Sequence, residues 1–111
     1  MAFGSDWTAA PLDAIWGIYA AVTRLPLDGS YPKGWFPEQR IPVAEAIKAY
    51  TLNPAYTSFQ ESILGSITPG KLADMVVLSQ DILNIPPETI KDTEILYTIT
   101  NGKIVYEKMA R

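Results

Sequence analysis

The sequence predicts an α+β fold in which helices come first along the chain and strands follow. Apolar residues recur at helical spacing before residue 60, whereas beyond Gly65 they form one nearly continuous run and then two strands around an Asn-Gly turn. Helices followed by strands favour segregated layers over an alternating parallel sheet. The chain has 111 residues, of which 48% are apolar and 19% charged, and this balance indicates one small folded domain.

The first expected helix runs from Leu12 to about Arg24, and Pro11 before it suits a helix start. Its apolar face is expected to consist of Leu12, Ile15, Trp16, Tyr19 and Val22. Gly17 weakens a helix, and we expect it to mark a close approach by another element.

The segment from Leu25 to Arg40 is expected to be an irregular loop, because it holds three prolines and two glycines. It also holds three aromatic residues, Tyr31, Trp35 and Phe36. Two interpretations are open: the aromatics pack the loop against the surface, which is the commoner case, or they line a ligand site.

Two more helices are expected before the strands. Pro42 to Leu52 carries an apolar stripe of Val43, Ala46, Ile47 and Tyr50. Asn53 is expected to cap a third, short helix with Pro54 in its first position, running to about Gln60.

The strands are expected in the last third of the chain. Leu72 to Leu78 is a nearly continuous apolar run, which predicts a strand buried on both faces. Pro87 to Lys91 is expected to form a helical turn. Ile95 to Thr100 and Lys103 to Glu107 flank Asn101-Gly102, a strong hairpin signal because both central residues of a type I′ turn need positive φ.

Composition excludes several classes of function. The net charge is −3 and the nine Lys and Arg residues are scattered, so we expect neither nucleic acid nor an anionic membrane as a partner. No apolar run reaches the roughly 20 residues of a membrane span, no signal peptide is recognisable, and the expected location is cytoplasmic. The chain has no cysteine and no histidine, which removes disulfides, thiolate nucleophiles and the commonest side-chain metal ligand.

Carboxylates are therefore the main candidates for chemistry. Asp6, in a Gly-Ser-Asp loop ahead of the first helix, is able to ligate a metal or accept a proton, but an ordinary loop acid fits the same pattern. Asp13 is explained by the dipole of its helix. Asp74 interrupts an apolar strand and is expected to meet backbone N–H groups or a polar edge. Glu38 and Glu45 have no acid or base partner nearby in sequence.

Several ordered motifs resemble the last part of the YtcJ-like group in amidohydrolase family 3. They are Gly4-Ser5-Asp6-Trp7, Pro11-Leu12-Asp13, residues 17–24, Pro37-Glu38-Gln39-Arg40-Ile41 and residues 44–51. Gly65 to Leu78, with its Pro-Gly-Lys-x-Ala-Asp sequence, resembles the stretch with which many amidohydrolases re-enter their small β domain. Residues 101–107 resemble their final hairpin.

The resemblance implies a metal-dependent hydrolase of non-peptide C–N bonds, built from a TIM barrel and a composite β-sandwich formed by both chain ends. Residues 1–64 would then be a remnant of the barrel, from the end of its eighth strand through its last helix and the helices that follow. Residues 65–111 would be C-terminal strands of the β-sandwich. Asp6 matches the acid after the eighth barrel strand, which in the family contacts the divalent metal, zinc in many members, and helps to activate water.

The family's histidine ligands have no counterpart in this sequence, and one carboxylate falls short of the roughly three protein ligands of a catalytic zinc. We therefore expect a fragment that binds no metal and is inactive by itself. Its expected partner is the rest of the hydrolase barrel, or a second copy in a homo-oligomer, because the first helix and the 72–78 strand would lack their covers. Two alternatives stay open: a free-standing interaction or binding module, and one half of a split hydrolase.

Overall fold

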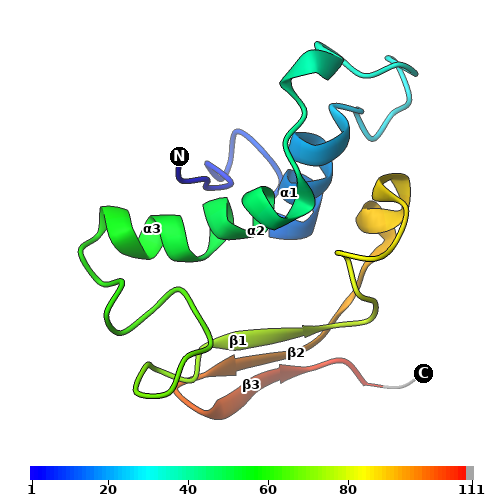
Figure 1. Ribbon diagram of the computed structural model, residues 1–111. Coiled ribbons are helices and arrows are strands. Elements are labelled where there is room, and N and C mark those ends of the chain that lie inside the picture. The colour runs from blue at the N-terminus through cyan, green and yellow to red at the C-terminus, as the bar shows by residue number, and fades with distance from the viewer. Residues whose placement is uncertain (110–111) are drawn as a thin grey trace.

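The computed structural model describes residues 1–109, with the helices on one side and a three-stranded sheet on the other (Figure 1). The helical elements that precede the sheet are α1 (Ala14–Thr23), the 3₁₀ turn η1 (Pro37–Gln39), α2 (Val43–Tyr50) and α3 (Leu52–Thr57). The sheet contains β1 (Met75–Leu78), β2 (Ile95–Thr100) and β3 (Lys103–Glu107), and the 3₁₀ turn η2 (Pro87–Asp92) lies between β1 and β2. The predicted α+β class is confirmed.

Helix α1 begins at Ala14, two residues later than expected, because Asp13 is its N-cap. The backbone N–H of Ile15 donates to the Asp13 carboxylate at 2.8 Å, which satisfies one of the free N–H groups at the helix start. Leu12 therefore lies outside the helix and is exposed, as is Trp16, so the expected apolar face was wrong at these two positions. Ile18 takes their place in the buried face.

Helices α2 and α3 follow one another almost without a break. Thr51 separates them, and Leu52 begins α3, so Asn53 is not its cap and Pro54 is not its first residue, contrary to expectation. The side-chain amide of Asn53 donates instead to the carbonyl of Met1 at 2.6 Å. The Met1 carbonyl is 52 residues away from Asn53 in the sequence, so the residues around Asn53 do not predict this contact.

The sheet is antiparallel in the order β1-β2-β3. Met75 pairs with Ile99 across β1 and β2, and Thr100 pairs with Lys103 beside the turn. Asn101 and Gly102 have φ values of 49° and 75°, which confirms the predicted hairpin. The expected strand over 72–78 is shorter, and it is not buried on both faces, because Val76 is 51% exposed and no second layer of the described residues covers it.

The core lies between the helices and η2, and it does not lie within the sheet. Its buried members are Ile15, Ile18, Tyr19 and Val22 from α1, Ala46 from α2, and Ile82 and Ile90 from the segment around η2. All five residues of β3 are exposed. Within the part of the chain that the structure describes, no helix is long and apolar enough to cross a membrane.

Candidate functional site

The N-terminal segment that carries Asp6 is attached to the helices at its start. The Phe3 N–H donates to the carbonyl of Ala49 at 2.7 Å, and the Phe3 ring meets the Tyr50 ring edge-on with centroids 5.5 Å apart. After Phe3, the N-terminal segment runs from its contact with α2 to the start of α1. These contacts position the Gly-Ser-Asp loop beside α1.

Asp6 is exposed and lies in the left-handed region with φ of 49°, a conformation that Asp tolerates better than most residues. Its carbonyl accepts the Ala9 N–H at 2.8 Å, which closes a turn. Within residues 1–109 no hydrogen bond or ion pair engages its carboxylate. The carboxylate is therefore available to a ligand or to another polypeptide.

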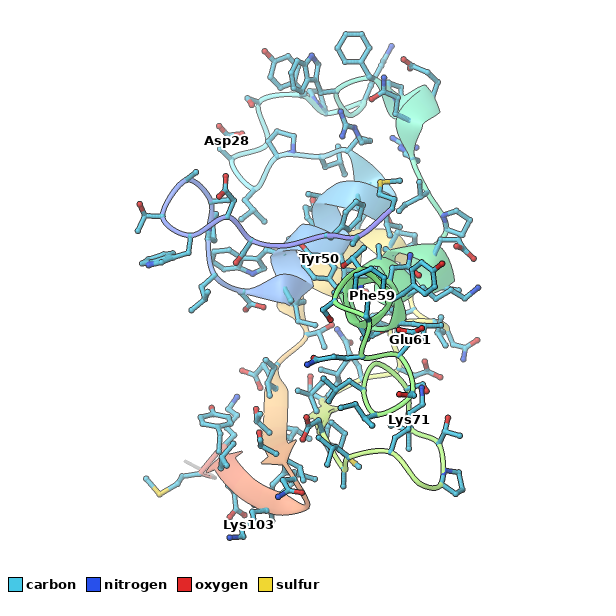
Figure 2. All side chains as sticks on the ribbon, turned by 90° about the vertical axis from the view of Figure 1, so that its left-hand side faces the viewer. Asp28, Tyr50, Phe59, Glu61, Lys71 and Lys103 are labelled. Atoms are coloured by element: carbon cyan, nitrogen blue, oxygen red, sulfur yellow. The ribbon has the colours of Figure 1, made fainter. Side chains whose placement is uncertain are left out.

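A hollow of about 260 Å³ lies next to this turn. It is lined mainly by apolar side chains, including Pro11, Trp16 and Leu27, and Gly4 and Ser5 lie at its border. Tyr50, labelled in Figure 2, also lines it, and burial raises the pKa of the Tyr50 phenol. The hydroxyl lies over Gly17, where an added Cβ would be 1.8 Å from its oxygen, and this confirms the expected close approach.

The other acids have structural partners or stand alone at the surface. One Asp74 carboxylate oxygen accepts the Asn101 N–H at 2.7 Å, which confirms the expectation that Asp74 meets a backbone N–H group. Glu45 forms an ion pair with Lys48 at 2.9 Å, and Glu38 lies exposed in η1. Within residues 1–109, none of these acids joins Asp6 in a group of three or more potential metal ligands.

The residues of this chain do not fit a metal ion by themselves. Among the described residues, no three His, Cys, Asp or Glu side chains come together in a group that could hold one. Asp6 offers one carboxylate where a catalytic zinc ordinarily has about three protein ligands.

The aromatic loop does not pack down as its commoner interpretation predicts. Tyr31, Trp35 and Phe36 are all at least half exposed. Arg24 holds the loop through a 2.9 Å hydrogen bond to the Trp35 carbonyl, and its guanidinium lies 6.0 Å from the centre of the Trp35 ring. Trp35 and Tyr31 border a second hollow of about 260 Å³ with Arg24, Leu25 and Pro26.

The sequence pattern does not predict one polar contact, which joins Lys71 to Glu61. The Lys71 ammonium donates to the backbone carbonyls of Glu61 and Leu64. The side chains of Glu61 and Lys71 lie on the same side of the molecule (Figure 2). One carboxylate oxygen of Glu61 is buried without a hydrogen-bond partner in the described chain. The pairing joins residues ten apart through a loop, and neither helical nor strand periodicity predicts such a contact.

The fold resembles that of a solved protein, an amidohydrolase from Thermotoga maritima MSB8. The two superpose with a TM-score of 0.60 at 24% identity, over 93% of this chain and 22% of that one. The α+β arrangement of this chain therefore also occurs as one part of a longer solved protein.

A profile described as the amidohydrolase family matches residues 1–106, and the chain belongs to this family. It is 39% identical over 95% of its length to the putative amidohydrolase YtcJ of Bacillus subtilis, and 38% identical over 96% to the protein LONG AFTER FAR-RED 3 of Arabidopsis thaliana. An N-substituted formamide deformylase of Arthrobacter pascens is 31% identical over 91% of the chain. The chain spans only 20%, 18% and 18%, respectively, of these relatives' lengths.

Proposed function

We propose that this chain is the C-terminal portion of a metal-dependent amidohydrolase that cleaves C–N bonds in non-peptide amides, and that it is inactive alone. In this proposal, residues 1–64 carry the end of the last barrel strand and α1 as the last barrel helix. Residues 65–111 supply strands of the β-sandwich. The observation that carries the proposal is the family match over residues 1–106, joined to the small share of each relative that the chain spans.

Asp6 is the catalytic residue that this chain contributes. Its exposed carboxylate, free of partners in the described part of the chain, is suited to accept a proton from an attacking water, and general-base groups of this kind contribute about 10²–10⁴-fold to rate. Asp6 would also be one ligand to the divalent metal of the assembled enzyme. The remaining ligands would come from the rest of the hydrolase barrel, since the described residues provide no others nearby.

The first test uses the 111-residue chain purified without chelator, with its native mass, bound metal and hydrolysis of N-substituted formamides and simple amides measured together. We expect less than stoichiometric metal and no hydrolysis above buffer. Stoichiometric metal together with turnover by the chain alone would contradict the proposal. The formamides are included because one relative is named for them.

The second test concerns Asp6 in an active assembly with the rest of the barrel. Asp6→Asn should reduce turnover by about 10² or more, because the amide cannot accept the proton. Asp13→Asn is the matched control: it keeps the N-cap of α1, so turnover should not change. Equal losses in both variants would remove the assignment of Asp6.

A split hydrolase is a second candidate, and co-purification of a separate His-bearing polypeptide with stoichiometric metal would favour it. A free-standing binding module is the third, and the exposed aromatic loop around Tyr31, Trp35 and Phe36 favours it. Ligand binding by a stable monomer, lost on Trp35→Ala and kept in Asp6→Asn, would support the module over the enzyme.

A further inference from the structure

Strand β3 is an open edge of the sheet. It pairs with β2 on one side, and no other strand of residues 1–109 lies beside it. The other outer strand, β1, faces α2 across a groove of about 640 Å³ whose walls include Ile47, Tyr50 and Met75. β3 lies on the side of the sheet away from the helices, with Lys103 at the far end of the hairpin (Figures 1 and 2). An incoming strand therefore reaches β3 without displacing a helix.

The exposed edge is apolar in its centre and charged at its two ends. Ile104, Val105 and Tyr106 are 60%, 62% and 48% exposed, and Lys103 and Glu107 flank them. Unpaired backbone groups beside exposed apolar side chains form a template for another strand.

The sequence of β3 is complementary to itself when it is read in the antiparallel direction. With Val105 on a two-fold axis, Lys103 lies opposite Glu107 of a second copy, and Ile104 lies opposite the second copy's Tyr106. Opposite charges and aromatic–aliphatic pairs are both favourable across antiparallel strands. We propose that a second copy of this chain binds at the β3 edge, so that two sheets join into one of six strands with two-fold symmetry.

The surface of the isolated chain is larger than its mass requires. It exposes 7936 Å², whereas a folded monomer of 12.3 kDa is expected to expose about 6,100 Å². A five-residue ladder covers only part of this excess. The β3 ladder is also irregular, with a register shift between Thr98 and Ile99 opposite Val105. The dimer is therefore expected to be concentration-dependent and weaker than complexes with the usual interface of about 1,600 Å².

Sedimentation velocity across a concentration series measures dimerisation, and variants that reverse the charges of Lys103 and Glu107 test whether it uses the β3 edge. Lys103→Glu places two like-charged pairs across the two-fold axis and should weaken dimerisation by roughly tenfold. Glu107→Lys should weaken it similarly. The double variant, Lys103→Glu with Glu107→Lys, restores both opposite-charge pairs and should recover the dimer.

Lys33→Glu is the matched control, since it makes the same charge change in the 25–40 loop and should leave dimerisation unchanged. Circular dichroism checks that each variant stays folded, which is expected because no ion pair in the described chain uses Lys103 or Glu107. A monomer at all concentrations, failure of the double variant to recover, an open series of larger assemblies, or a different polypeptide at this edge would each overturn the proposal.

Discussion

Tyr50 links three parts of the helical half through one side chain. Its ring packs against Phe3 of the N-terminal segment, its hydroxyl lies over Gly17 of α1, and its backbone ends α2. The partly apolar setting disfavours the phenolate, so its pKa is raised above the ordinary value of 10.0.

This shift predicts how Tyr50 responds to alkali. Below about pH 10 the phenol is neutral in both the folded and unfolded states, and its contribution to stability is fully present. As pH rises through the higher folded pKa, this contribution is lost, because the unfolded chain ionises first. An ultraviolet titration of phenolate should show that Tyr50→Phe removes a step above pH 10.0 from the six tyrosines. Loss of a step at or below that value would contradict the assignment.

At the scale of elements, Gly65 determines how closely the chain after α3 approaches that helix. Gly65 has φ of +83°, and an added Cβ would lie 2.8 Å from the Ala55 Cβ and 3.0 Å from the Thr51 carbonyl oxygen. Both the backbone conformation and the contact with α3 therefore require glycine.

Gly65→Ala should lower the free energy of unfolding by about 2–4 kcal/mol, from strain in the left-handed conformation and from overpacking. Gly70→Ala separates the two causes: its φ is +93° but no atom lies within 4 Å of its added Cβ, so only about 1–2 kcal/mol is expected. Urea denaturation of both variants measures the difference. Equal losses would mean that contact with α3 contributes nothing.

Elements that depend on neighbouring residues could be predicted from the sequence. Features that depend on contacts between residues far apart in the sequence could not. The Asn101-Gly102 turn and the α1 helix follow from residues within a few positions, and both were confirmed. The exposure of β1 was not predicted, because an apolar run does not reveal whether a second layer covers it. For the candidate site, the sequence singles out Asp6, but the availability of its carboxylate depends on which distant groups fold beside it.

At the scale of the whole molecule, stability depends on a small core. Ile90 is 0% exposed and is the largest fully buried side chain among residues 1–109, and it packs from η2 against the buried face of α1. This core joins α1, early in the sequence, to η2, late in the sequence, so a loss of packing here affects both parts of the chain.

Ile90→Val should lower the free energy of unfolding by about 1 kcal/mol, because it removes one buried methylene and leaves a void. Ile67→Val deletes the same group from a side chain that is 79% exposed, and its effect should stay within about 0.5 kcal/mol. Thermal or urea unfolding of the pair gives the comparison. A similar effect in both variants would mean that Ile90 is not central to the core.

The position of Ile82 and Ile90 within the helical core also governs how this chain can be recombined with its relatives. In a chimaera joined at residue 64, the helices of one homologue would pack against the core residues of another. The junction itself would lie in the loop between α3 and β1. Exchange of the hairpin alone, from Ile95 onward, leaves the helices with the core partners they already have. Sequence change at Ile82 and Ile90 is therefore coupled to change in α1, whereas change in the hairpin is coupled mainly to β1, with which β2 pairs.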